Sequence, residues 1–153
     1  MPNGFADQAT NNDTISKGVS IAPLLDAPVF EGFETPTFPP ANWSIQNPDG
    51  LLTWERTTAA AKTGTGSMVI RNFDYQVGNT MDDFISPVIK YQPTVDSFFV
   101  SFDYAYSQGV QYPGSTTLPL DTLELQLTQD CGLTFTSIWK KWGGDLQTIG
   151  DPN

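Results

Sequence analysis

The sequence contains no histidine, and this absence excludes several common catalytic and metal-binding arrangements. Without an imidazole there is no Ser-His-Asp or Cys-His nucleophile, no HExxH zinc site and no histidine acid–base catalysis. Cys131 is the single cysteine, so no disulfide bond forms within the chain. Because this thiol has no histidine partner, we interpret Cys131 as a small, partly buried core residue.

Positive charge and long apolar runs are also scarce. The chain carries 7 basic against 17 acidic residues, a net charge of −10. Proteins that bind nucleic acids need the opposite sign to neutralise phosphates, so we expect no nucleic-acid partner. No apolar run approaches the roughly 20 residues that cross a bilayer, so we expect no membrane insertion. The acidic surface favours solubility and is compatible with binding a hard cation such as Ca²⁺.

Turn-forming and aromatic residues are plentiful instead. The 12 prolines and 13 glycines argue against long helices, and aromatics make up 12% of the chain. Alternation is clearest in 121–130, where Leu123, Leu125 and Leu127 are expected to face the core. The pattern predicts an all-β fold, most plausibly an antiparallel jelly-roll β-sandwich. We expect strands in the ranges 29–33, 42–46, 51–58, 67–73, 82–89, 96–106, 121–130 and 134–142.

The chain divides into two parts at a proline-bounded stretch. Residues 1–22 are polar and end in an alternating segment, 14–21, which predicts a half-buried edge strand. Residues 23–28 contain Pro23 and Pro28 around an apolar pair, so we expect a linker there. Residues 29–153 then form the β-sandwich domain.

Several segments occur in an order typical of one family: FEGFETPTFPPANW, NPDGLLTWE, GSMVI, DDFISPVI, FVSFDYAY and DTLELQLTQDCGLTF. Over about residues 29–139 the chain resembles the cleaved-adhesin, or choice-of-anchor J, domain, which is related in pattern to the MAM domain. Residues 1–22 resemble the end of a PKD-type domain. The resemblance implies a jelly roll in secreted bacterial surface proteins, often upstream of a type IX secretion sorting tail.

The sequence departs from the family pattern in two ways. Family domains continue beyond the W…GG region with further strands, whereas this chain stops at residue 153. We therefore expect an incomplete sandwich with an open edge, a partner chain or a shortened variant. The turn NPDG at 47–50 is also less acidic than its family counterpart, which weakens a cation site there.

The resemblance implies a structural calcium ion. Glu34 matches the glutamate of the family's Phe-Glu opening and is the first ligand candidate, followed by Asp103 and Asp49. Calcium takes six to eight oxygen ligands, which carboxylates at strand ends can supply. The alternative for Glu34 is an ordinary hydrogen-bonded carboxylate, and for Asp103 a solvent-facing one.

Aromatic residues give a second set of candidates. Trp43 and Trp54 match core positions of the family, so we expect them in the core. Trp139 and Trp142 lie beside lysines and are the candidates for an exposed platform on which sugar rings stack. Tyr106 and Tyr112 belong to a long polar loop and complete the predicted ligand set.

We therefore expect a non-catalytic adhesion or substrate-targeting module of a secreted, multidomain bacterial surface protein. Its partners would be an extracellular glycan or protein and other domains of the same parent chain. One alternative is an accessory domain, for stability or secretion, of a secreted metallopeptidase. Another is a structural spacer in a repeat array. The acidic pairs Asp82/Asp83 and Glu31/Glu34 lack an accompanying cleft, so we expect no glycosidase activity.

Overall fold

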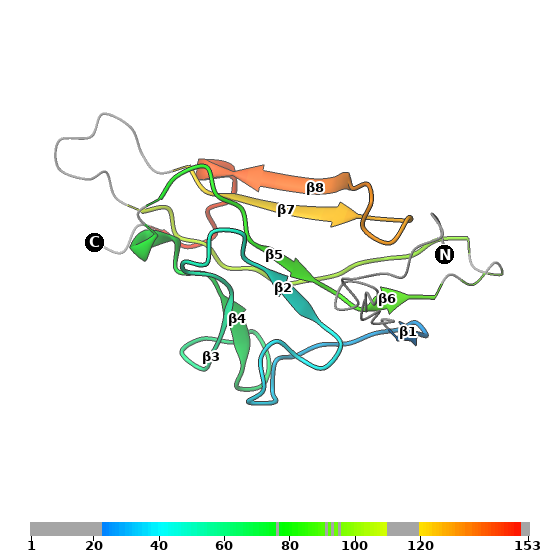
Figure 1. Cartoon of the computed structure of the whole chain (residues 1–153). Helices are drawn as coiled ribbons and strands as arrows, with labels where there is room; N and C mark the ends of the chain where they lie inside the picture. Colours follow the sequence, from blue (N-terminus) through cyan, green and yellow to red (C-terminus); the bar gives the residue numbers. More distant parts are fainter. Residues whose placement is uncertain are drawn as a thin grey trace, which may run out of the picture.

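The computed structural model describes residues 23–75, 77–90, 92, 94, 96–109 and 120–150 (Figure 1). Regular structure in these residues consists of short strands and two 3₁₀ turns, without an α-helix. This confirms the all-β class. The elements are β1 (Leu24–Leu25), β2 (Ser44–Gln46), β3 (Glu55–Thr57), β4 (Ser67–Val69), η2 (Asn72–Asp74), β5 (Asp83–Ile85), β6 (Val88–Ile89), β7 (Thr122–Leu127), β8 (Thr136–Trp142) and η3 (Gly143–Asp145).

The strands pair two by two. β2 pairs with β5, β3 with β4 and β7 with β8, all antiparallel, whereas β1 and β6 are parallel. Among the described residues these pairs form separate two-stranded sheets and do not merge into the two larger sheets of a sandwich. The jelly-roll arrangement therefore stays a prediction.

The predicted linker contributes to the folded body. Within 23–28, β1 pairs with β6, and Lys90 N donates to Leu25 O at 2.8 Å. Residues 24 and 25 are thus fixed to the strand that follows β5. The polar segment 1–22, with its predicted strand at 14–21, lies outside the described residues, as do residues 151–153.

Two predicted strands are wrong. Residues 29–33 form none, because Phe33 has a left-handed backbone with φ of 59°, which a strand does not allow. Residues 96–106 are assigned no strand either, despite their alternation. Alternation predicts which side chains share a face, but a β-ladder also needs a neighbouring strand.

An aromatic cluster is centred on Phe84 of β5, which with β2 lies below β7 and β8 in Figure 1. Trp43 stacks on the Phe84 ring with centroids 4.8 Å apart, and Phe38 stacks at 5.6 Å. The indole N–H of Trp54 donates to the Asp82 carbonyl at 3.0 Å. All of these rings are half-buried. Trp43 and Trp54 thus belong to this half-buried cluster, and their place in the core of a sandwich stays a prediction.

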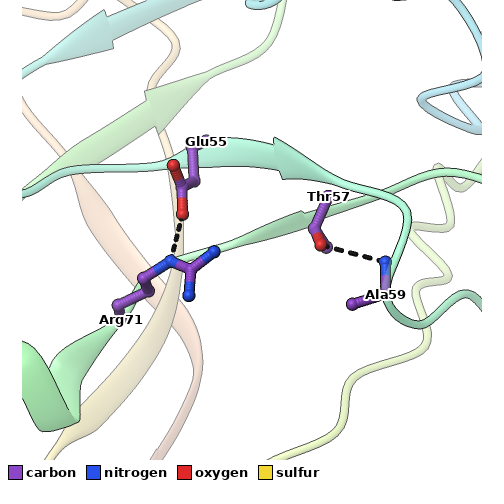
Figure 2. A network of polar contacts seen from close by, with 4 residues as sticks. All are labelled: Glu55, Thr57, Ala59 and Arg71. Carbon is purple, nitrogen blue, oxygen red and sulfur yellow. Dashed lines mark hydrogen bonds and ion pairs between the residues drawn. The ribbon is translucent and has the colours of Figure 1, made fainter.

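Polar contacts hold the ends of the β3–β4 hairpin (Figure 2). Arg71, just beyond β4, forms an ion pair with Glu55 at the start of β3. At the other end of β3, the Thr57 hydroxyl accepts a hydrogen bond from Ala59 N at 3.1 Å. Both contacts are exposed, so each stabilises the hairpin only modestly.

The loop 128–135 joins β7 to β8. Within it, Cys131 and Gly132 have successive positive φ values of 60° and 87°, a left-handed backbone conformation that favours glycine and asparagine. The Asp130 carboxylate accepts hydrogen bonds from the Thr134 amide at 2.9 Å and the Thr134 hydroxyl at 2.6 Å. Cys131 is exposed in this loop. Its interpretation as a core residue is therefore wrong, because the turn geometry and not burial sets its place.

Candidate binding face and the predicted ligand residues

Glu34 is fixed by the loop that precedes β4. Its carboxylate accepts the Thr65 hydroxyl at 2.8 Å, the Thr65 amide at 3.0 Å and the Gly66 amide at 3.1 Å. These hydrogen bonds, that of the Thr65 hydroxyl above all, lower the pKa of Glu34. The backbone at Gly66 lies so close to the backbone at Phe33 that a Cβ atom on residue 66 would lie 2.1 Å from the Phe33 carbonyl oxygen. Glycine is therefore required at position 66.

The side chain of Arg56, in β3, donates hydrogen bonds to backbone carbonyls of the same segment, residues 33 and 34. The Arg56 Nε donates to the Phe33 carbonyl at 2.6 Å, and its Nη2 donates to the Glu34 carbonyl at 3.3 Å. In the structure Glu34 thus ties the 59–66 loop to the chain segment before β2, which matches its hydrogen-bonded alternative. Arg56 and Thr65 were not predicted from the sequence, although the glycines at 64 and 66 were a signal of close backbone approach.

The other two predicted calcium ligands have different partners. The Asp103 carboxylate lies 3.7 Å from the Lys62 ammonium. Asp49 accepts hydrogen bonds from the Tyr75 hydroxyl and from the Leu51 amide, and these lower its pKa. No group of three or more acidic or cysteine residues in the described part of the chain could hold a metal ion. Glu34, Asp103 and Asp49 therefore do not fit one calcium site, and the calcium ion stays a prediction.

The β7–β8 pair has two chemically different faces, because directly paired residues project to the same side of a sheet. On the first, the inner face, Leu125 pairs with Trp139 and Leu123 with Lys141. The Trp139 ring packs edge-on against Phe102, with centroids 5.3 Å apart and planes at 88°. Trp139 is therefore half-buried within an aromatic contact.

Lys141 places a positively charged side chain on the same inner face. Its ammonium donates to the Tyr104 hydroxyl at 2.8 Å and lies 5.8 Å from the centre of the Trp139 ring. This geometry combines a hydrogen bond with a cation–π contact. The sequence placed Lys141 beside two tryptophans but did not predict this pairing.

The second, or outer, face is polar and ends in an exposed tryptophan. Its register pairs are Thr122 with Trp142, Glu124 with Lys140, and Gln126 with Ser137. The Lys140 ammonium lies 3.1 Å from the Glu124 carboxylate. Hydrogen bonds from Ser137, Gln126 and Lys140 lower the pKa of Glu124, that from Ser137 contributing most.

Trp142 lies at the end of β8 with 53% of its surface exposed. The two tryptophans proposed as one platform therefore lie on opposite faces, because an odd number of positions separates them on β8. The outward alternation of Thr122, Glu124 and Gln126 was visible in the sequence. Lys140 and Trp142 lie on the same face as these residues because of the register between β7 and β8, which the sequence does not specify.

Tyr106 lies beside the same end of the strand pair. Its hydroxyl donates to the Asp121 carboxylate at 2.8 Å, and its amide donates to the Thr148 hydroxyl at 2.8 Å. Burial and the nearby Asp121 raise the pKa of Tyr106. Both interactions are structural, since they join the 96–109 region to β7 and to the segment after η3. Tyr112, the other predicted tyrosine, lies outside the described residues.

No helix among the described residues is long and apolar enough to cross a membrane. The scan against family models and the searches of curated proteins and solved structures find no match for this chain. The resemblance to the cleaved-adhesin domain therefore stays an interpretation of the sequence segments.

Proposed function

We propose that this chain is a non-catalytic module that attaches a secreted, multidomain bacterial surface protein to extracellular glycans, for adhesion or substrate targeting. The observation that carries the proposal is the outer face of β7–β8. There a half-exposed Trp142 adjoins Thr122, and the Glu124–Lys140 ion pair lies next along the strands.

The chemistry of this face suits a sugar ring. The flat apolar face of an indole packs against the C–H groups of a pyranose, which removes apolar surface from water. The Glu124 carboxylate accepts hydrogen bonds from sugar hydroxyls, and the Lys140 ammonium donates them. Charge-assisted hydrogen bonds of this kind fix orientation and are stronger than neutral ones.

The size of the face argues for weak binding at each module. One exposed tryptophan buries about 150–250 Å² of surface at most, which is little beside the cost of immobilising a ligand. Surface proteins overcome this by repeating such modules, because linked sites raise the overall avidity. The resemblance to repeated adhesin domains and the absence of histidine from the sequence both support a binding role over a catalytic one.

A glycan array tests the proposal, with the Trp142→Ala variant beside the wild type. We expect the wild type to mark a limited set of glycans and the variant to lose at least most of that signal. Leu133→Ala is the matched control, because Leu133 is 85% exposed but lies in the β7–β8 turn away from the outer face. A silent array, or equal signals from Trp142→Ala and wild type, would contradict the proposal.

The calcium ion implied by the resemblance is tested separately. Thermal unfolding is measured after EDTA treatment and again after CaCl₂ is restored, together with elemental analysis of the purified protein. A melting temperature that falls with EDTA and recovers with calcium supports the ion. An unchanged melting temperature and no bound metal would remove it, without affecting the glycan proposal.

A further inference from the structure

The outer face of β7–β8 is a row of polar pairs that follows the strands. Three register pairs succeed one another on it: Thr122 with Trp142, Glu124 with Lys140, and Gln126 with Ser137. Glu124 is half-buried, and the other five residues are exposed. Alternate residues of a strand lie about 6.6 Å apart, so the three pairs span roughly 13 Å along β7. A single pyranose ring is shorter than this span, whereas a linear oligosaccharide can follow it.

The charges on this face are matched within the protein. The Lys140 ammonium lies 3.1 Å from the Glu124 carboxylate, which also accepts hydrogen bonds from Ser137 and Gln126. The positive and the negative side chain therefore already have each other as partners. An anionic sugar would have to draw Lys140 away from Glu124, against a net charge of −10 on the chain. A cationic sugar would have to displace Lys140 from the same carboxylate.

The same network keeps hydrogen-bonding capacity for uncharged groups. An ammonium has three N–H donors and a carboxylate has about four lone-pair sites, so Lys140 and Glu124 are not exhausted by their contacts within the protein. When the Gln126 amide group donates to Glu124, its carbonyl oxygen stays free to accept. Sugar hydroxyls both donate and accept, so they match this mixed set without bringing a charge.

We propose that the outer face of β7–β8 binds neutral, linear oligosaccharides that lie along the strands from Trp142 to Gln126. This inference rests on the proposed glycan binding and specifies its ligand class. One ring stacks on the Trp142 indole. The hydroxyls of the following rings contact first the Glu124–Lys140 pair and then the pair at the far end of the row. A net hydrogen bond at each further pair raises the affinity about two- to tenfold.

The charge requirement is tested with immobilised polysaccharides of three classes: neutral (mannan and N-acetylated chitin among others), anionic (alginate) and cationic (chitosan). We expect the wild type to bind neutral polymers, with an affinity that does not change between low and high salt, because no ion pair with the ligand is screened. Tighter binding to an anionic or cationic polymer than to every neutral one overturns the inference. So does an affinity that falls steeply with salt. Both results leave glycan binding itself intact.

Chain length is tested by calorimetric titration of the neutral glycans that bind, as oligomers of increasing length. We expect the affinity to rise until the oligomer spans the three register pairs and then to level off. Gln126→Ala removes a side chain at the far end of the row. It should weaken binding of the longest oligomer about two- to tenfold and leave the shortest one that binds unchanged, which also shows that the variant is folded.

Gln129→Ala is the matched control, because it makes the same substitution at an exposed position in the loop after β7 and should change neither affinity. Equal affinities for the shortest and longest oligomers overturn the inference, as does a Gln126→Ala variant that binds long oligomers like the wild type. Trp142→Ala separates the two proposals, since it weakens oligomers of every length. If Trp142→Ala has no effect, the glycan site itself is refuted and this inference falls with it.

Discussion

At the scale of single residues, carboxylates in this protein hold turns and loops through backbone amides. Asp130 binds the Thr134 amide, Glu34 binds the Thr65 and Gly66 amides, and Asp49 binds the Leu51 amide. An ionised carboxylate is the strong acceptor in each of these contacts. Protonation weakens the hydrogen bonds, so acid loosens these turns before it affects apolar packing.

Asp130 shows the effect most strongly. Hydrogen bonds from the Thr134 side chain and amide lower its pKa from 3.8 to about 2. The unfolded chain therefore binds more protons between these values, and the stabilisation, complete above pH 3.8, is lost as pH falls through about 2. Carboxyl-carbon NMR should give a titration midpoint near 2, and Thr134→Val should raise it. A wild-type midpoint near 3.8 would contradict this.

Glu34 should control the order of the loop at 59–66. Glu34→Gln keeps the shape of the side chain but removes its charge, so the contacts from Thr65 and Gly66 weaken. We expect trypsin to cleave after Lys62 severalfold faster in this variant, because cleavage requires local opening of the loop. Asp74→Asn is the control, since it neutralises an exposed acid outside the loop. Equal cleavage rates for Glu34→Gln and wild type would refute this role.

Cys131 carries backbone strain that another residue would relieve. Its φ of 60° is unfavourable for most side chains, whereas asparagine tolerates the left-handed conformation better. Cys131→Asn should therefore raise the free energy of unfolding by about 0.5–1 kcal/mol. Chemical denaturation measures the change, with Gln129→Asn as the control at a position of negative φ. A loss of stability in Cys131→Asn would contradict the strain assigned to this residue.

At the scale of elements, the aromatic cluster is the feature that joins strands distant in sequence. Phe84 of β5 contacts four other rings, those of Phe33, Phe38, Trp43 and Trp54. Phe84→Ala removes the ring that all of them share and should lower the free energy of unfolding by about 3 kcal/mol. Phe99→Ala is the matched control and should change it by less than about 0.5 kcal/mol, because Phe99 is exposed. Equal losses in both variants would contradict a core centred on Phe84.

The sequence predicted elements best where local signals agree. The alternation in 121–130 predicted a strand, and the structure places β7 there, in the longest strand pair, β7–β8. Prediction failed at 96–106, where the same alternation occurs but the described residues form no strand ladder. Alternation shows which side chains prefer the core and which prefer solvent. The pairing of one strand with another depends on contacts with residues far along the chain.

The candidate site was only partly accessible from sequence. Trp142 was identified, because an exposed tryptophan beside lysines is unusual. Trp139 was grouped with it, but the strand geometry places it on the inner face against Phe102. Glu124 became part of the face only through its register with Lys140. The sequence thus identified single candidate residues. Which of them share one surface depends on the strand pairing, which the structure provides.

At the scale of the whole molecule, apolar surface remains open. Apart from two prolines, Leu146, with 3% of its surface exposed, is the one buried aliphatic or aromatic residue in the described part of the chain. Exposed apolar side chains are found in residues 98–102, on β8 and in the loop between β7 and β8. Surfaces of this kind mark sites of association in soluble proteins. The proposed glycan site uses only the part of it that lies on the outer face of β7–β8.

The central claim is that the outer face of β7–β8 binds a glycan, and NMR mapping tests it most directly. A ¹⁵N-labelled chain is titrated with glycans that bind it on the array. We predict shifts of the Trp142 indole and of the Glu124 and Lys140 amides, while the Trp139 indole on the inner face stays in place. Shifts confined to other regions, or no shifts with any glycan tested, would contradict the claim.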